Sequence, residues 1–411
     1  MISVTMVSRS RHLPLLLIAF ALPACRGVSA TSVPAQDSST DGSPNDVTSG
    51  DEAVGDSTTS DALDTGEAEA SSICVEDCWV PISPSGIHPR ADAAAIWLDD
   101  RVLIAGGWFA QGFQRFCADD CAQYVPEIDK WTAVSGGVCN GTDRTRGIWT
   151  GQAALVPAGG ALHAFTPASG HWDKYQPPDD VFLENSIIWT GSIALLWAGA
   201  NTPSCGVSFD PSTKAFSPMS PPDPSLCRRG QSVVWAGDRM IVWGGYLADA
   251  TDRGAAYDPT ARVWTPISSS GAPAPRSDAP AVWTGKQVLV WGGEKWDSAS
   301  GTTSGFRYDG GLYDVASDTW RPVAPPPSAT GDSTNAVWAD DRLMVWSGVG
   351  GWIYDPDTDE WTAMSTVGAP STGLGAAIVW TGSELMVWGG GYPYATPEMP
   401  AARYRPPPKG K

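Results

Sequence analysis

A tryptophan recurs seven times in the chain at intervals of 40 to 55 residues, and each copy ends a short apolar segment such as Ala281-Val282-Trp283. Gly or Asp stands two positions after every copy, and Gly always stands ten positions after it. Self-similarity at such a period indicates stacked supersecondary units that bury their faces against one another. The seven copies are Trp97, Trp149, Trp189, Trp235, Trp283, Trp338 and Trp380.

The residues that follow each of these tryptophans predict four strands. Gly or Asp two positions later suits a tight hairpin turn with positive φ. The uninterrupted apolar run that comes next, such as Val288-Leu289-Val290-Trp291, indicates a second strand covered on both faces. Two aromatic residues seven positions apart then flank a turn of the Asp258-Pro259-Thr260 type, which predicts a hairpin of third and fourth strands. These pairs are Tyr124 and Trp131, Phe165 and Trp172, Phe209 and Phe216, Tyr257 and Trp264, Tyr313 and Trp320, and Tyr354 and Trp361.

Four-stranded antiparallel units of about 48 residues that cannot cover their own faces are typical of β-propeller blades. The seventh unit ends too early, because the position seven after Tyr404 is the last residue, Lys411. Trp79-Val80-Pro81-Ile82 near the start matches the fourth-strand sequence Trp264-Thr265-Pro266-Ile267. We therefore predict an all-β fold, a seven-bladed β-propeller of four-stranded antiparallel blades whose N-terminal strand completes the last blade. A transmembrane barrel is the competing architecture, but its strands would alternate polar and apolar residues, and these second strands do not.

The segment from Gly271 to Gly293, followed by Tyr313 and Trp320, resembles a Kelch repeat in its double glycine, its Tyr and its spaced Trp. The resemblance extends over residues 79 to 404. It implies a propeller but no single activity, because Kelch-like propellers include protein-binding modules, sugar-active proteins and copper oxidases.

The first 24 residues predict an export signal, with a basic start and an apolar run, Leu13 to Leu22, that is too short for a permanent membrane helix. The run leads to Leu22-Pro23-Ala24-Cys25, which resembles the bacterial lipoprotein signal. That resemblance implies cleavage before Cys25 and a diacylglycerol anchor on its thiol. Arg26 in place of Asp implies the outer membrane by the same family's sorting rule. The alternative is a plain secretory signal with an incidental cysteine.

Residues 25–72 predict a disordered acidic tether between this anchor and the propeller, residues 73–411. From residue 26 to residue 72 the chain has ten carboxylates, one Arg and no aromatic side chain, so it cannot bury enough apolar surface to fold. The net charge of the whole chain is -19, which argues against nucleic acid or an anionic membrane surface as a partner. We expect a protein of the bacterial cell envelope that contacts the membrane through its lipid only.

The sequence gives little support to catalysis. Galactose oxidase has a similar architecture and holds its copper with two His and two Tyr, whereas the histidines after the signal here, His88, His163 and His171, form no convergent pair. Asp355-x-Asp357-x-Asp359 begins like a calcium loop but lacks the following Gly and the terminal Glu. We predict no catalytic residue, no metal and no cofactor. The alternatives are a sugar epimerase or oxidase-like enzyme on the same scaffold, and a structural lipoprotein without a specific ligand.

Seven cysteines after Cys25 predict disulfide bonds, because an exported protein meets an oxidising environment. Cys205 follows the second strand of the third unit and Cys227 precedes the fourth unit, so both should emerge on one face and pair. Zinc is the alternative for the two Cys-x3-Cys pairs, although its usual spacing is shorter. The odd number leaves one thiol free or paired outside the chain. The other candidate bridge joins Cys117 or Cys121 to Cys139, and Cys74 and Cys78 are further candidates whose partners the sequence does not fix.

Recognition is expected on the loops between second and third strands, because loops on a rigid scaffold vary freely. These loops are longest in the first and fifth units and carry aromatic residues and Arg, which are enriched in binding hot spots. We expect a monomeric propeller that binds a protein or glycan partner with this face. The alternative is that these rings pack only their own loops. The candidate binding residues are Trp108, Phe109, Phe113, Arg115, Phe116, Tyr246, Arg253, Trp296, Arg307, Tyr308, Tyr392 and Tyr394.

Overall fold

The computed structural model describes residues 74–111, 114–138, 145–178, 186–197, 204–219, 221, 223–297, 299–328, 335–348, 350–372, 374–392 and 401–409. These residues belong to one compact unit, Glu69–Lys411. The predicted signal, the tether and Cys25 lie outside them. In this described part of the chain, no helix is long and apolar enough to span a membrane.

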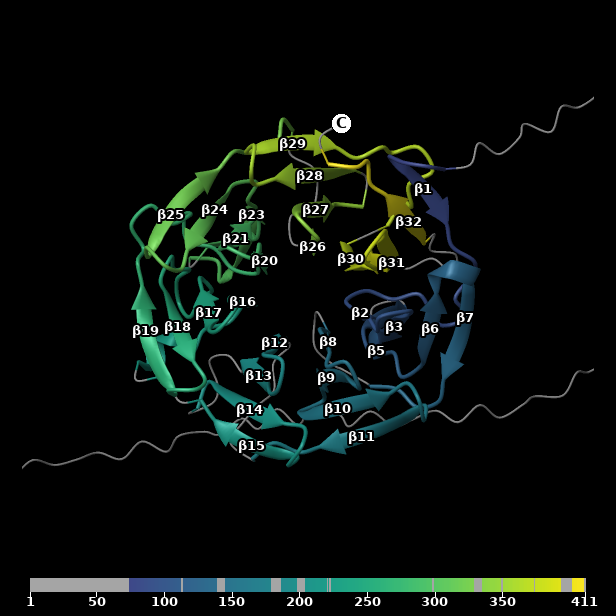
Figure 1. The fold of residues 1–411 in the computed structure, drawn as a ribbon, viewed down its shortest axis with the longest axis horizontal. Coiled ribbons are helices and arrows are strands. Elements are labelled where there is room, and N and C mark those ends of the chain that lie inside the picture. Colours follow the sequence, from purple (N-terminus) through teal and green to yellow (C-terminus); the bar gives the residue numbers. More distant parts are fainter. Residues whose placement is uncertain are drawn as a thin grey trace, which may run out of the picture. The chain divides into compact units, whose positions relative to one another are not determined.

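The described residues form seven four-stranded antiparallel sheets arranged as the blades of a propeller (Figure 1). Blade 1 contains β2 (Ala94–Trp97), β3 (Val102–Ala105), β6 (Cys121–Val125) and β7 (Lys130–Val134). Blade 2 contains β8 (Ile148–Trp149), β9 (Ala154–Ala158), β10 (Ala161–Thr166) and β11 (His171–Tyr175). Blade 3 contains β12 (Ser186–Trp189), β13 (Ala194–Trp197), β14 (Gly206–Asp210) and β15 (Ala215–Pro218). Blade 4 contains β16 (Ser232–Trp235), β17 (Met240–Trp243), β18 (Gly254–Asp258) and β19 (Val263–Ile267).

The remaining blades follow the same plan. Blade 5 contains β20 (Ala281–Trp283), β21 (Gln287–Trp291), β24 (Gly310–Asp314) and β25 (Thr319–Val323). Blade 6 contains β26 (Ala336–Ala339), β27 (Arg342–Trp346), β28 (Gly351–Asp355) and β29 (Glu360–Ala363). Blade 7 contains β30 (Leu374–Trp380), β31 (Leu385–Tyr392), β32 (Ala402–Arg405) and β1 (Cys78–Pro81). Two short 3-10 helices, η1 (Pro126–Ile128) and η2 (Pro224–Leu226), interrupt the connections.

The blades form a closed ring. The first strand of each blade lies innermost and the fourth lies at the rim (Figure 1). Each first strand contacts the first strands of both neighbours, including β2 of blade 1 with β30 of blade 7. The second strands are buried along most of their length, as their apolar sequences predict.

The predicted closure by the N-terminal strand is confirmed. β1 pairs antiparallel with β32 and places Trp79 opposite Tyr404, although the two residues lie at opposite ends of the propeller sequence. The buried Trp79 ring lies 4.5 Å from the ring of Trp346 in blade 6 and 5.1 Å from that of Tyr404, between ring centres. The strand β1 therefore completes blade 7, and its Trp79 also covers the face of blade 6.

The turn chemistry of the repeat is also confirmed. The residue two positions after every marker tryptophan has positive φ, whether it is Gly or Asp. In two blades this Asp has a second role, because its carboxylate accepts from the marker indole of the next blade. Trp149 donates to Asp99 at 2.8 Å, and Trp380 donates to Asp340 at 3.0 Å.

The paired aromatic residues lie opposite one another on the third and fourth strands, with ring centres 4.8 to 5.1 Å apart. The fourth-strand tryptophan also packs on the second-strand tryptophan of the preceding blade at five of the seven junctions. Blades 1 and 2 have Ala105 and Pro157 at this second-strand position. The five contacts are Trp197 with Trp264, Trp243 with Trp320, Trp291 with Trp361, Trp346 with Trp79, and Trp388 with Trp131.

Four blades fix their outer strand to the preceding blade with one repeated set of hydrogen bonds. In blade 7 the Tyr404 hydroxyl donates to Asp77, which also accepts from the backbone N–H of Ser365 at 3.0 Å. The Trp79 indole donates to the Ser365 carbonyl at 2.7 Å. The closing strand β1 is thus held by the same bonds as the fourth strands that directly follow the third strand of their own blade in sequence. Equivalent bonds run through Asp129, Asp318 and Asp359 in blades 1, 5 and 6.

Two disulfide bonds join described residues. Cys205–Cys227 connects blade 3 to the loop that enters blade 4, as predicted from their common face. Cys74–Cys78 lies at the start of β1, so this Cys-x3-Cys pair forms a disulfide rather than a zinc site.

The cysteines of blade 1 require a choice between two predicted alternatives. Cys117 is disulfide-bonded, whereas Cys121 is a free thiol. Cys121 begins β6 and is buried in the apolar core between blades 1 and 2, and this burial raises the pKa of its thiol. The alternative that placed Cys121 in a disulfide is therefore wrong. Cys139, the expected partner of this pair, lies outside the described residues.

We expect Trp79→Ala to lower the free energy of unfolding by about 3 to 5 kcal/mol, because a buried ring that joins two blades is lost. Val75→Ala in the same segment should change it by less than about 0.5 kcal/mol, because Val75 is exposed. Guanidinium denaturation of both variants measures the difference. A near-neutral Trp79→Ala would contradict closure by β1.

Candidate binding face

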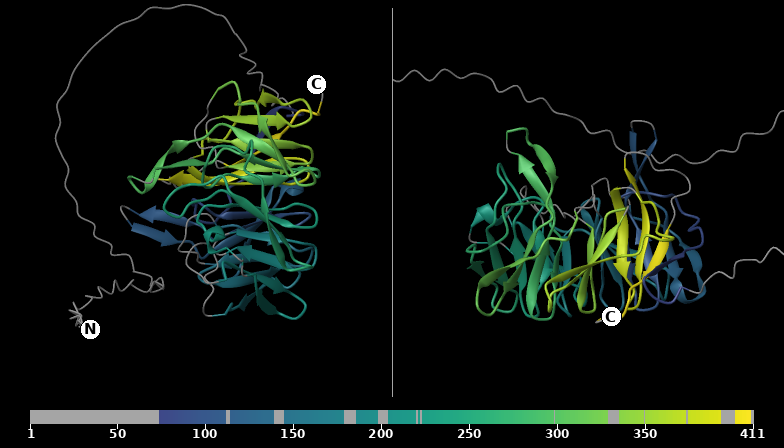
Figure 2. Two further views of the ribbon diagram at one scale, coloured as in Figure 1. Left: turned by 90° about the vertical axis from the view of Figure 1, so that its left-hand side faces the viewer. Right: turned by 90° about the horizontal axis from the view of Figure 1, so that it is seen from above.

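Two hairpins project from one end of the ring (Figure 2). They are β4 (Trp108–Gln111) with β5 (Gln114–Cys117) in blade 1, and β22 (Glu294–Asp297) with β23 (Thr302–Phe306) in blade 5. The sequence predicted long loops here, and the structure folds them as strands. We call this end the hairpin face; it consists of these two hairpins and the connection of blade 4, residues 244–253.

Buried arginines hold the bases of both hairpins. Arg90 donates to the carbonyls of Gly106 at 3.2 Å and Asp120 at 2.8 Å, and its guanidinium pairs with the Asp120 carboxylate. In blade 5, Arg276 donates to the carbonyl of Asp309 at 2.8 Å and pairs with its carboxylate at 2.9 Å. Burial lowers the pKa of both guanidinium groups, and the paired carboxylates oppose this effect. Each hairpin therefore rises from a rigid, charge-neutralised base.

Trp108 is a structural residue of the first hairpin. Its side chain is buried, and its indole donates to Asp92 at 2.9 Å. The exposed guanidinium of Arg115 lies 4.1 Å from the Trp108 ring centre, which suits a cation–π contact. Trp108 therefore packs within its own loop, which was the alternative to a binding role, and Arg115 covers the Trp108 ring on its solvent side.

The outer part of the same hairpin presents an apolar surface. Phe109 stacks on His88 with ring centres 4.0 Å apart, and it lies 5.7 Å from the ring of Phe116. Phe116 remains 37% exposed, which is unusual for so large an apolar side chain.

The connections of blades 4 and 5 support one another. Tyr246 stacks on Trp296 with ring centres 3.9 Å apart, and the Trp296 indole donates to the Ala248 carbonyl at 2.9 Å. Leu247 beside this stack is 50% exposed. Arg253 at the end of the same connection is also exposed.

The remaining candidates have other positions. Arg307 donates to the Pro275 carbonyl at 3.1 Å, and Tyr308 packs against the core of blades 5 and 6. Tyr392 ends β31 rather than standing in a loop. Phe113 and Tyr394 lie outside the described residues. The structure thus gathers the candidates into two groups, one on blade 1 and one on blades 4 and 5.

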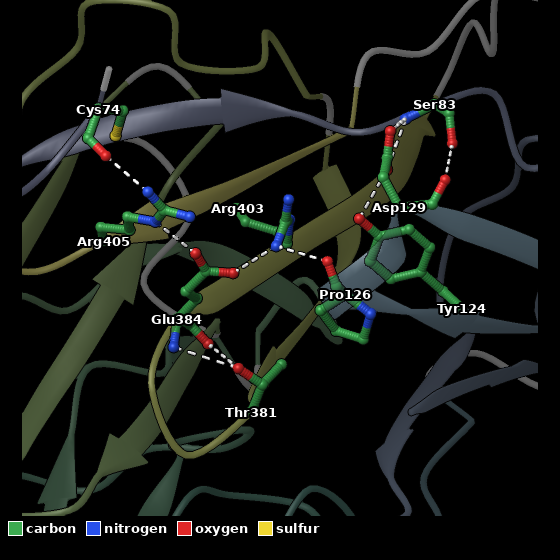
Figure 3. Close-up of polar contacts among 9 residues, drawn as sticks. All are labelled: Cys74, Ser83, Tyr124, Pro126, Asp129, Thr381, Glu384, Arg403 and Arg405. Atoms are coloured by element: carbon green, nitrogen blue, oxygen red, sulfur yellow. Dashed lines mark hydrogen bonds and ion pairs between the residues drawn. The ribbon is translucent and has the colours of Figure 1, made fainter. Parts of the chain in front are cut away.

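A buried carboxylate, Glu384, links blade 7 to blade 1 through Arg403 (Figure 3). It stands in the turn between β30 and β31, at the end of the blade opposite to the hairpins. Glu384 accepts from Arg403 at 2.7 Å and from Arg405 at 2.6 Å. Arg403 also donates to the Pro126 carbonyl of blade 1 at 3.0 Å, and Arg405 donates to the Cys74 carbonyl. This network was not predicted from the sequence. Its one sequence signal is the spacing of the two arginines, since residues i and i+2 of a strand share a face.

The histidines do not converge on one site. His88 lies in the loop that enters blade 1, and His163 and His171 lie on β10 and β11 of blade 2. Burial, aided by the positive charge of Lys174, lowers the pKa of His163. Within the described ranges, no group of three His, Cys, Asp or Glu side chains is placed to hold a metal ion.

The three carboxylates of the Asp355-x-Asp357-x-Asp359 motif in blade 6 contact side chains of the same chain. The ammonium of Lys409 lies 3.2 Å from Asp355 and 2.8 Å from Asp357. The third carboxylate, Asp359, accepts the hydroxyl of Tyr354 at 2.6 Å. The motif therefore acts as a hairpin turn and as a contact for the C-terminal segment.

Four-stranded blades with paired aromatic residues and glycine turns define a β-propeller built from Kelch-type repeats. The profile of the KLHDC2/KLHL20/DRC7 Kelch-repeats domain matches residues 184–391, which is just over half of the 411-residue chain. The chain belongs to the Kelch-repeat family. A propeller of this family supports a role in protein binding or as a scaffold.

Among solved structures, that of YjhT is similar to this chain. The match covers 70% of this chain and 99% of the YjhT chain, with 14% sequence identity and a TM-score of 0.49. No curated protein sequence matches the chain.

Proposed function

We propose that this protein is a binding module that holds a protein partner on its hairpin face and carries out no catalysis itself. The observation that carries this proposal is the pair of ordered hairpins on one end of the ring, each held at its base by a buried Arg–Asp pair. Glycan binding by the same face is the second form of this role.

The exposed side chains of the hairpin face suit a protein partner. Phe116 and Leu247 are two of the few large apolar side chains that the described residues leave exposed, and both lie on this face. Arg115 and Arg253 are exposed beside them. Aromatic and arginine side chains around an apolar centre are the groups that dominate the energy of protein interfaces.

The rigidity of the face favours tight binding. The hairpin of blade 1 is fixed by Arg90 and by the indole bond of Trp108, and that of blade 5 by Arg276 and the stack on Tyr246. A surface that is already ordered loses little conformational entropy when a partner binds. The hairpins therefore need not fold at the moment of recognition.

We further propose that the propeller is tethered to a bacterial membrane, in the outer membrane, through a lipid on Cys25. The support is the Leu22-Pro23-Ala24-Cys25 sequence and Arg26 after it. A flexible coil of the composition of residues 26–72 would let the propeller reach roughly 35 to 40 Å from the bilayer. This reach suits a module that captures partners near the membrane.

We expect the double variant Phe116→Ser, Leu247→Ser to lose its partner when the protein is crosslinked and purified from native envelopes. The control is Ile128→Ser, Val263→Ser, which alters side chains that are 64% and 53% exposed on the opposite end of blades 1 and 4. Both variants should melt like the parent protein. Equal recovery of the same partner by the two variants would contradict the proposed face.

We expect Cys25→Ser to abolish labelling by radioactive fatty acid and to release the protein from the membrane fraction. Arg26→Asp should keep the lipid but move the protein to the inner membrane, which tests the sorting separately. A Cys25→Ser variant that remains lipid-labelled would refute the anchor.

A further inference from the structure

In blade 7 alone, the third and fourth strands are not consecutive in the chain. In blades 1, 5 and 6 a third-strand tyrosine donates to an aspartate five positions later in the same hairpin, at 2.6 to 2.7 Å. This aspartate has positive φ and stands two positions before the fourth-strand tryptophan. In blade 7 the same bond, from Tyr404 to Asp77 at 2.5 Å, joins residues 327 positions apart. The turn is absent from this blade, but its bond is kept.

The Cys74–Cys78 disulfide takes the place of the missing turn. It closes a loop that contains Asp77 directly before Cys78, the first residue of β1. Asp77 has a φ of 50°, and the equivalent aspartates of blades 1, 5 and 6 have φ values of 46° to 58°. Such a conformation is uncommon for residues other than Gly, so the surrounding structure has to hold it. The disulfide therefore constrains Asp77 as a hairpin turn constrains its equivalents.

The disulfide loop is also bonded to the third strand. In blades 3 to 6 an aspartate follows the third-strand aromatic residue and accepts a backbone N–H of the hairpin turn, at 2.8 to 3.0 Å. In blade 7 this position is Arg405, which donates to the Cys74 carbonyl at 2.5 Å and to Glu384 at 2.6 Å. The polarity of the contact is reversed, because the disulfide loop offers a carbonyl where the hairpin offers an N–H. This bond depends on the position in which the disulfide holds Cys74.

Reductants can reach the Cys74–Cys78 disulfide. Both of its cysteines are partly exposed, and the three residues between them are exposed. The cysteines of the Cys205–Cys227 disulfide are buried, with exposed fractions of 1% and 7%. Thiol–disulfide exchange requires a thiolate to reach a sulfur atom, so the first disulfide should react before the second.

We infer that the Cys74–Cys78 disulfide is a redox-controlled latch on the ring, whose reduction by a dithiol releases β1 from blade 7 in a larger fraction of molecules. A thiolate of the dithiol attacks one sulfur and forms a mixed disulfide, and the other cysteine leaves as a thiolate that takes up a proton. The second thiol of the reductant then attacks the mixed disulfide and releases the remaining cysteine. The chain gains two electrons and two protons, and the dithiol becomes a disulfide.

Reduction should loosen the ring at one place only. Asp77 would lose its fixed conformation, and with it the bonds from Tyr404 and Ser365. Departure of β1 would then leave the edge of β32 unpaired and the ring of Trp346 without its cover. The oxidised protein is a closed ring, whereas the reduced protein opens at blade 7. This control acts on ring closure and goes beyond the binding role of the hairpin face.

Hydrogen exchange of the folded, full-length protein, measured by mass spectrometry, tests the latch. Dithiothreitol is the dithiol used, and alkylation of the released thiols identifies which disulfide is reduced. We expect Cys74–Cys78 to be reduced first. Exchange of the β1 backbone N–H groups that bond to β32 should then rise by about tenfold or more, while exchange in β17 of blade 4 stays unchanged. Reoxidation should restore the protection of β1.

Two aspartate variants test whether the disulfide acts through Asp77. In Asp77→Ala, exchange in β1 should already be fast in the oxidised protein, and reduction should raise it by only about twofold, because the two changes remove the same contacts. The matched control is Asp318→Ala, which removes the equivalent bond from Tyr313 in blade 5, where a turn joins the two strands. In that variant, reduction should raise exchange in β1 by about tenfold or more, as in the parent protein.

The inference fails if Cys205–Cys227 is reduced first, or if reduction of Cys74–Cys78 leaves exchange in β1 unchanged. It also fails if exchange rises in all seven blades together, since the disulfide would then stabilise the whole fold rather than one strand. The double variant Cys74→Ser, Cys78→Ser should exchange rapidly in β1 without any reductant. Slow exchange in this variant would assign the effect of dithiothreitol to another disulfide and refute the latch.

Discussion

The pairing of β1 with β32 is the interaction on which the ring depends. Without it, blade 7 would present the unpaired edge of β32, and the second-strand tryptophan of blade 6, Trp346, would lose the ring of Trp79 that covers it. Closure removes that edge and lets every blade pack on two neighbours. Polar contacts also hold this junction. Tyr404 of β32 donates to Asp77, which precedes β1, and Arg403 of β32 pairs with Glu384.

Much of this architecture could be predicted because the determining chemistry is local and repeated. Positive φ after each marker tryptophan and the cross-strand aromatic pairs follow from residues close in sequence. The closing strand was recognisable because its amino-acid sequence matches that of the other fourth strands. The blade 1 hairpin and the Glu384 network were not predictable in this way, since each depends on side chains far apart in sequence, such as Arg90 with Asp120 and Glu384 with Arg403, that meet only in the folded chain. Cys117 and Cys121 illustrate the limit: four residues apart, they differ because β6 buries Cys121 between two blades.

The two ends of the ring have different physical characters. At one end, Glu384 and the C-terminal Lys409 tie neighbouring segments together with ion pairs internal to the chain. At the hairpin end, the ordered bases of the loops leave Phe116, Leu247 and Arg253 facing outward. A surface with those residues on a rigid support is suited to recognition, whereas satisfied ion pairs are suited to holding the ring closed.

The binding role of the hairpin face is tested most directly by site-specific photocrosslinking in living cells. A photoreactive phenylalanine analogue would replace Phe116 or Leu247 on the hairpin face, and Ile128 or Val263 on the opposite end. We expect a discrete crosslinked partner from the first two positions and none from the other two. A partner captured from Ile128 or Val263, with none from the hairpin face, would contradict it.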